Sequence, residues 1–259
     1  MKKMLLAVLA LLIIAAVAFG VRTLGARDET DKVDAKDAAG LVDQADSDTT
    51  IDEGARPEAG TYSYTGSGKE TIDALGGSEH VFPTTIAVVI TLDAKDDCRW
   101  TSNVIYAKQH VEERTYCTDD MGVLDLGFVR KIEFFNQLET KEYTCKDARR
   151  LDVDATEGAK SEWRCENGTQ ATSDYASTLL GMETLTVGGE QVDTWHSRVT
   201  SKQAGETVGG DISEFWVAET GLLVRFSADL KVTTASVLGT TKFQEKLDYT
   251  LTSLVPKAA

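Results

Sequence analysis

The residues best suited to chemistry in this chain are its three histidines, His80, His110 and His196. No two of them stand two or four positions apart, so no histidine pair is spaced to hold a metal on one strand or helix. Glu112 and Glu113 follow His110, and on a strand a carboxylate could share the histidine's face. Because this segment is polar, we expect an exposed edge there and predict no metal site.

Other motifs that could support catalysis fail on their spacing. Residues 66–69 read Gly-Ser-Gly-Lys, but a phosphate loop would need glycine in place of Ser63 and serine or threonine in place of Glu70. The aspartate pairs at 96–97 and 119–120 are more typical of turns than of a cation site. No Gly-x-Ser-x-Gly nucleophile motif is present. The sequence therefore predicts no catalytic residue and no cofactor, and we expect a protein that is not an enzyme.

The chain has four cysteines, Cys98, Cys117, Cys145 and Cys165. No two lie within four residues of each other, which excludes the usual zinc and redox spacings. An even number outside the cytoplasm favours two disulfides, for which three pairings exist. We favour Cys98–Cys117 and Cys145–Cys165, because each would close a loop of about 20 residues that one hairpin can span, worth about 3 kcal/mol.

The first 58 residues indicate where the protein resides. Lys2 and Lys3 precede an uncharged apolar run over residues 4–21, so residues 1–26 are predicted to be a signal peptide or a signal anchor. The basic end stays in the cytoplasm, which places the rest outside. Residues 27–58 are acidic and predicted to be a disordered linker. We expect a single-pass protein of the cell membrane with its C-terminal domain outside the cytoplasm, or a secreted protein if the segment is cleaved.

The net charge of −15 limits the partners. An acidic surface repels the phosphates of nucleic acids, and no basic cluster offsets it, so we expect no nucleic-acid binding. The expected partners are the membrane through residues 4–21, a lipid or other apolar ligand, and another envelope protein.

Alternating apolar and polar residues predict β-strands in the remainder of the chain. Period two is clearest over residues 222–233 and returns over 243–252 and 86–93. Glycine turn signals cut residues 178–254 into about five strands in sequence order, an antiparallel meander. The tract over residues 147–160 is predicted to be a long polar loop.

These strands predict one all-β domain over residues 59–259. A long sheet with one apolar face must cover that face, by curving into a half-barrel, by closing, or by packing on a second sheet. We expect an antiparallel meander that forms a curved half-barrel or a β-sandwich, preceded by the N-terminal membrane helix.

Large apolar residues on the predicted strands are candidates for lining a ligand pocket, since ligand pockets are lined mainly by apolar and aromatic side chains. The alternative is that they only pack the core. The candidate ligand-binding residues are Trp195, Trp216, Leu222, Val224, Phe226, Leu230, Phe243 and Tyr249.

One hairpin carries a resemblance to a known group. Residues 187–196 and 215–225, with Trp216, Gly221, Leu222 and Arg225 in a W-x-x-x-x-G-L-x-x-R pattern, resemble the C-terminal half of secreted actinobacterial proteins. Those proteins are similar to the LolA/LppX/RseB-like superfamily of envelope lipoprotein carriers. The resemblance implies an open half-barrel whose concave face holds a lipid chain, or a protein-sensing domain. The chain departs from that pattern because it has neither a clear helical plug nor a lipid-anchoring cysteine.

Two functions therefore remain open at the level of sequence. The first is a membrane-tethered extracytoplasmic protein that binds an apolar, lipid-like ligand on the concave face of a sheet. The alternative is a non-enzymatic sensing or structural module that contacts another envelope protein.

Overall fold

The computed structural model describes residues 56–236 and 239–258. The predicted membrane segment, residues 1–26, lies outside the described residues, as does nearly all of the linker predicted over 27–58. At the end of that linker, Arg56 is buried against the domain and its guanidinium donates to the carbonyl oxygen of Arg99 at 3.1 Å. Among the described residues, no helix has the length and apolar character needed to span a bilayer.

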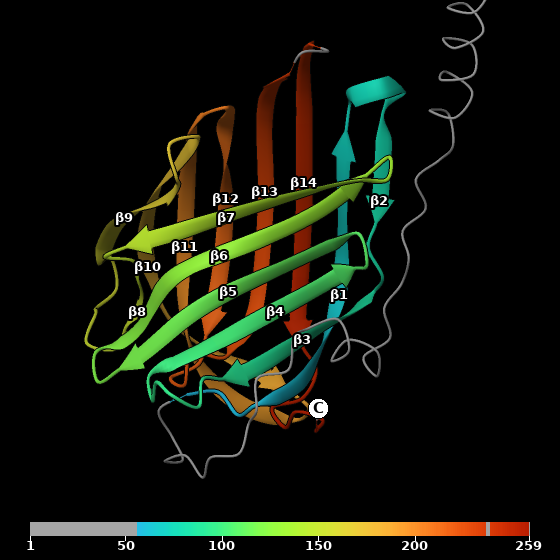
Figure 1. Ribbon diagram of the computed structural model, residues 1–259. Helices are drawn as coiled ribbons and strands as arrows, with labels where there is room; N and C mark the ends of the chain where they lie inside the picture. The colour runs from blue at the N-terminus through green and yellow to red at the C-terminus, as the bar shows by residue number, and fades with distance from the viewer. Residues whose placement is uncertain (1–55, 237–238, 259) are drawn as a thin grey trace, which may run out of the picture.

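The described chain folds into an antiparallel sheet that closes on itself. β1 pairs with β3 along its first half and with β14 along its second, so the ring has no free edge (Figure 1). The twelve strands of the ring, in order, are β1 (Gly60–Ile72), β3 (Thr85–Leu92), β4 (Arg99–Ala107), β5 (His110–Asp119), β6 (Gly122–Phe134), β7 (Gln137–Lys146), β9 (Lys160–Asn167), β10 (Ala171–Val187), β11 (Glu190–Gly205), β12 (Thr207–Val217), β13 (Leu223–Ser236) and β14 (Gly239–Leu251).

Three short elements complete the barrel. A 3-10 turn, η2 (Ala74–Gly76), leads into β2 (Ser78–Val81), which pairs with the end of β1. The strand β8 (Arg149–Asp152) pairs with the start of β6. It lies in the tract over 147–160, so the long polar loop predicted there is partly a strand.

The prediction of a half-barrel or a sandwich was wrong, whereas the all-β antiparallel class was correct. The barrel closes because β1 and β14 pair over nine residues, from Tyr64↔Leu251 to Ile72↔Phe243. Closure satisfies backbone groups that two open edges would leave without partners. The meander predicted over residues 178–254 corresponds to the five consecutive strands β10 to β14.

Two layers of strands face each other across the barrel. In Figure 1, β3 to β7 cross in front of β11 to β14. Tyr106 on β4 contacts aromatic side chains of the opposite layer, with ring centroids 6.4 Å from Phe226 and 6.4 Å from Tyr249. The interior is therefore shared by side chains from both layers.

One end of the interior is an apolar core. Trp100 stacks on Tyr116 with centroids 4.4 Å apart, and its indole N–H donates to the Thr118 hydroxyl at 2.9 Å. Gly221, in the turn between β12 and β13, has φ +89° and lies against the Trp100 ring, where a Cβ would come within 3.1 Å. The glycine of the W-x-x-x-x-G-L-x-x-R pattern therefore allows the turn to pack closely against Trp100.

The two predicted disulfides are confirmed. Cys98–Cys117 joins the turn before β4 to β5, and Cys145–Cys165 joins β7 to β9. The second bond bridges a seam in which only three residue pairs are in register, the shortest pairing in the ring. Covalent closure therefore reinforces the barrel where its backbone ladder is shortest.

Candidate functional site

A cavity of about 390 Å³ occupies the other end of the barrel interior. One wall is apolar and comes from alternate positions of β13 and β14, while β6 contributes aromatic and aliphatic side chains from the opposite layer. The apolar lining residues of these three strands are Phe128, Ile132, Phe134, Phe226, Ala228, Leu230, Val232, Phe243 and Leu247.

The cavity is open to solvent at the end of the barrel that holds the turn between β1 and β2. Leu75 in that turn lines the cavity and is 46% exposed. Gln137, at the start of β7, also lines it and is exposed, and Thr241, near the start of β14, lines it and is partly exposed. A ligand could therefore enter without separating any paired strands.

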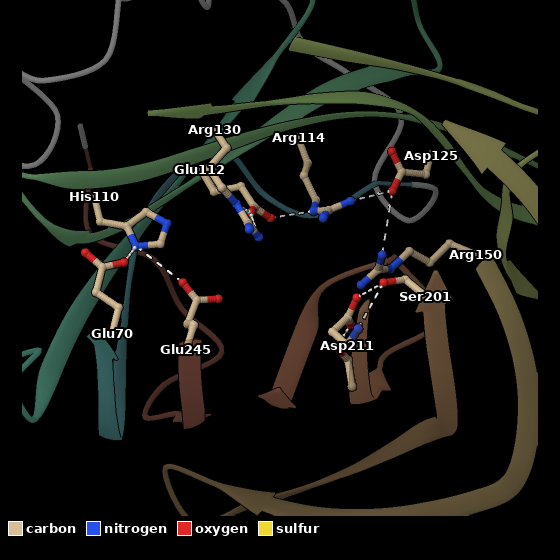
Figure 2. A network of polar contacts seen from close by, with 11 residues as sticks. Glu70, His110, Glu112, Arg114, Asp125, Arg130, Arg150, Ser201, Asp211 and Glu245 are labelled. Carbon is tan, nitrogen blue, oxygen red and sulfur yellow. Dashed lines mark hydrogen bonds and ion pairs between the residues drawn. The ribbon is translucent and has the colours of Figure 1, made fainter. Parts of the chain in front are cut away.

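Charged side chains from β5 and β6 form the inner part of the cavity (Figure 2). Glu112 accepts from Arg130 at 2.6 and 2.8 Å and from the Nε of Arg114 at 2.8 Å. Arg114 also donates to Asp125 at 2.9 Å. Burial would raise the pKa of Glu112, but the two arginines outweigh it and hold that pKa well below its usual range. Glu112 is therefore ionised, with both cations fixed beside it.

Arg150 extends this network to the opposite layer. Its guanidinium lies 3.6 Å from Asp125 and stacks on Phe215 at 3.9 Å from the ring centroid. Nearby, Asp211 on β12 accepts hydrogen bonds from the hydroxyls of Ser201 and Ser213 (Figure 2). The barrel interior thus carries a polar network beside an apolar wall.

A second buried cluster lies at the β1–β14 side of the cavity. One ring nitrogen of His110, Nδ1, lies 2.8 Å from Oε2 of Glu70 and 3.4 Å from Oε2 of Glu245 (Figure 2). Glu70 and His110 are fully buried, and Glu245 is 3% exposed and lines the cavity. The other oxygen of Glu70 lies 2.7 Å from Nδ1 of His80, whose ring stacks on Phe134.

Electrostatics separates the protonation states in this cluster. Burial raises the pKa of Glu70, but His110 and His80 outweigh it and lower that pKa to about 2. Burial lowers the pKa of His110, yet the neighbouring Glu70 carboxylate raises it overall above 6.5. Burial raises the pKa of Glu245, so this acid holds its proton more tightly than an exposed one. The cluster is therefore an ion pair between Glu70 and His110 beside Glu245, which is a weaker acid than an exposed glutamate.

The expectation that His110 lies on an exposed polar edge was wrong. β5 pairs with β4 on one side and β6 on the other, and the face that carries His110, Glu112 and Arg114 points into the barrel. The aspartates at 96–97 and 119–120 lie at turns, as predicted. Asp96 accepts from the backbone N–H of Cys98 at 3.2 Å, and Asp119 ends β5 and accepts from the N–H of Met121 at 3.0 Å.

Only some of the predicted ligand residues line the cavity. Phe226, Leu230 and Phe243 do. Leu222 and Trp195 line two separate and smaller spaces, of about 60 and 10 Å³.

The remaining predicted ligand residues do not border the cavity. Val224 and Tyr249 are fully buried in the apolar core, and the Tyr249 hydroxyl donates to the Pro83 carbonyl at 2.9 Å. Their place is consistent with the core-packing alternative.

Trp216 lies on the outer face of the barrel, which corrects its predicted place in a pocket. Its neighbour Phe215 faces the cavity, so the period of the strand turns Trp216 outward. There it stacks on His196 with centroids 4.1 Å apart and lies under the Arg225 guanidinium at 4.7 Å. Trp216 and Arg225 are cross-strand partners, so two residues of the W-x-x-x-x-G-L-x-x-R pattern meet on the outside.

Sequence reasoning missed the charged residues of the interior. Glu245 interrupts the apolar alternation between Phe243 and Leu247, and Glu70 continues the inward-facing set of Tyr62 and Tyr64. The signal available in the sequence was a charged residue at a position where the period-two alternation of a strand calls for an apolar one.

The fold and the site define a class: a disulfide-linked, closed antiparallel β-barrel with an internal cavity that is apolar on one wall and charged at its inner end. Neither a family model nor a curated protein matches the chain.

Two solved structures are similar to it at low identity. The hypothetical lipoprotein YmcC from Escherichia coli (K12) is 14% identical, with 86% of this chain and 100% of that chain covered and a TM-score of 0.32. A protein from Parabacteroides distasonis described as a lipoprotein is 9% identical, with 76% and 96% covered and a TM-score of 0.28. At these TM-scores the likeness carries no inference about ligand or activity.

Proposed function

We propose that this protein works outside the cytoplasm as a binding protein for an amphiphilic, lipid-like molecule held inside the barrel. The apolar chain of the ligand would lie along β13 and β14, and its polar group would lie near Arg130 and Glu112. The observation that carries the proposal is the cavity itself, about 390 Å³ in volume and open at one end.

The dimensions and lining of the cavity support a small amphiphile. Its volume falls within the range of about 300–1,000 Å³ typical of small-molecule sites. Each methylene group moved from water onto the apolar wall would contribute about 0.8 kcal/mol. A chain of several such groups would therefore supply the affinity, without any catalytic group.

The charged inner end supports a head group that accepts hydrogen bonds. Arg130 has five N–H donors, and two of its three nitrogens, Nε and Nη2, contact Glu112. Lys141 also lines the cavity, with its Nζ 3.3 Å from the Thr207 hydroxyl. A carboxylate or phosphate oxygen would find donors at both positions.

The two disulfides support the location. Such bonds persist in oxidising compartments and are rare in the cytoplasm. An exported binding protein held near a membrane by residues 1–26 would meet lipids at the bilayer surface.

The test is photolabelling with a defined probe. The full chain would be reconstituted in phosphatidylcholine vesicles that contain a diazirine-bearing palmitic acid, irradiated, and mapped by peptide mass spectrometry. We expect labels on β13 and β14. The variant Ala228→Phe fills the cavity, because Ala228 lines it, and should reduce this labelling about tenfold, equivalent to about 1.4 kcal/mol.

The matched control is Ser227→Phe, which adds the same ring one position away on the outer face of β13. It should leave the labelling unchanged. Equal labelling of the two variants, or labels confined to residues 1–26, would contradict the proposal and favour the alternative of a module that contacts another envelope protein.

A further inference from the structure

Three buried side chains bring metal-ligand atoms together beside the cavity. One nitrogen of His110 and one oxygen each of Glu70 and Glu245 all lie within 4.8 Å of one another. They come from β5, β1 and β14, so the closure of the barrel assembles them. Figure 2 shows the His110 ring nitrogen facing both carboxylates.

The polar atoms of this cluster lack aligned hydrogen-bond partners. Both ring nitrogens of His110, Oε2 of Glu70 and Oε2 of Glu245 are buried without a hydrogen bond. The contact of 2.8 Å between His110 and Glu70 is short enough for an ion pair, but its direction is not that of a hydrogen bond. Native proteins rarely leave several buried polar atoms unsatisfied at one point, and ligation of a metal would satisfy Nδ1 of His110 and the two carboxylate oxygens.

We propose that Glu70, His110 and Glu245 form a binding site for a divalent transition-metal ion of the zinc type. Metal–ligand bonds of about 2.0–2.2 Å place neighbouring ligand atoms about 3–3.5 Å apart. The separations of 2.8 and 3.4 Å from His110 to the two carboxylates therefore need only small shifts, and the ligand atoms of all three residues lie within 4.8 Å of one another. An imidazole with two carboxylates suits zinc and its neighbours, and the two carboxylates balance the ion's charge in a buried place.

The surroundings of Glu70 match those of a metal ligand. His80 contacts the oxygen of Glu70 that faces away from the cluster, at 2.7 Å, and the His80 ring is held by stacking on Phe134 at 4.2 Å. Such outer contacts orient a ligating carboxylate and fix its position.

The site has an entry path and an open side. Glu245 lines the cavity, so an ion can reach the cluster from the cavity mouth. Three protein ligands leave at least one coordination position for water or for a donor group in the cavity. The metal site does not depend on the proposed lipid, because its three ligands are all provided by the protein.

A second histidine with two glutamates provides the comparison. On the outer face, His196 contacts Glu183 through Nδ1 at 3.4 Å and Glu214 through Nε2 at 3.3 Å. The two carboxylates therefore lie at different ring nitrogens, and both already accept hydrogen bonds, Glu183 from Trp216 and Glu214 from Arg198. We expect no site there, although the composition is the same.

The test measures zinc binding to the full chain, purified in a non-ionic detergent and stripped with a chelator. Calorimetric titration with Zn²⁺ and elemental analysis should give one tightly bound ion per chain. Zn²⁺ at about a hundredfold excess over Kd should raise the Tm by about 5 °C, reversed by chelator. Glu245→Gln keeps the shape of the side chain but removes the charged ligand, and should weaken binding at least about 100-fold.

The matched control, His196→Gln, should bind zinc as the natural chain does. Equal affinity in Glu245→Gln, or the absence of a tight site in the natural chain, would overturn the proposal. Because a substitution inside the barrel could impair folding, Co²⁺ bound to the natural chain gives an independent reading. Visible Co²⁺ absorption bands that are typical of nitrogen and oxygen ligands, and that disappear when one equivalent of Zn²⁺ displaces the Co²⁺, support the site. The absence of such bands counts against it.

Discussion

The two ends of the barrel are built from the same alternating strands but differ in what fills the interior. On β14, the inward positions run from Leu251 and Tyr249 in the apolar core to Glu245 and Phe243 at the cavity. On β1, the fully buried Tyr64 gives way to the fully buried Glu70. The difference teaches that one strand can fill an apolar core at one end and place charged side chains beside a cavity at the other.

This division of labour has a physical reason. Large apolar side chains in a dry core contribute the most stabilisation per residue, whereas buried charges stabilise little even when paired. A packed end allows the other end to keep an unfilled space and a charged network.

Truncating a core side chain at each end tests the division most strongly. Trp100→Ala in the packed end should lower the free energy of unfolding by about 3–5 kcal/mol. Leu230→Ala at the cavity should lower it by only about 2 kcal/mol, because the new space joins an existing one. Urea denaturation of the two variants measures both values. A loss at Leu230 equal to that at Trp100 would break the comparison.

Removing each disulfide sharpens the comparison. The two loops are of nearly equal length, with separations of 19 and 20 residues, so chain entropy alone predicts about 3 kcal/mol for each. Cys145→Ala/Cys165→Ala should nevertheless be the more damaging pair, because β7 and β9 share only three residue pairs in register. Hydrogen exchange should then rise in β7 and β9. If removal of Cys98–Cys117 accelerated hydrogen exchange in β4 and β5 to the same extent, the expected difference between the two disulfides would be contradicted.

Acid should weaken one surface contact of the packed end by a small amount. A side-chain hydrogen bond from Arg149 lowers the pKa of Asp119 below its ordinary 3.8. Because the folded pKa is the lower one, this stabilisation is present above 3.8 and is lost as the pH falls below it. For a pair this accessible to water we expect no more than about 0.5 kcal/mol.

The measurement for this pair is the pH dependence of stability in the natural chain and in Asp119→Asn. The stability of the variant should no longer depend on the titration of residue 119, and the variant should be slightly less stable at neutral pH. An identical acid slope in both proteins would show that the pair does not contribute.

Local sequence patterns predicted the strands but could not predict the closure of the barrel. The alternation over residues 222–233 is a local property, so the face of β13 that carries Phe226 and Leu230 could be predicted. Closure depends on the pairing of β1 with β14 at opposite ends of the domain, which no local pattern encodes. The same reason hid the cluster of Glu70, His110 and Glu245, since its members come from three strands far apart in sequence.

The side of a strand on which a residue lies also depends on register. Trp216 has the aromatic character of a pocket residue, but a register shift between Trp216 and Val217 and the inward position of Phe215 decide its place outside. The pairs Cys98–Cys117 and Cys145–Cys165 could be predicted because each closes a short loop.

Native mass spectrometry of the full chain tests the central claim, that the open end of the barrel holds an amphiphile, most directly. The protein would be expressed in an oxidising compartment and released from detergent micelles in the spectrometer. We predict an added mass that extracts as lipid from the natural chain and from Ser227→Phe, and that is about tenfold less abundant in Ala228→Phe. A natural chain with only the mass of the polypeptide less four hydrogens for its two disulfides, or an adduct that is as abundant in Ala228→Phe as in the natural chain, would contradict the account.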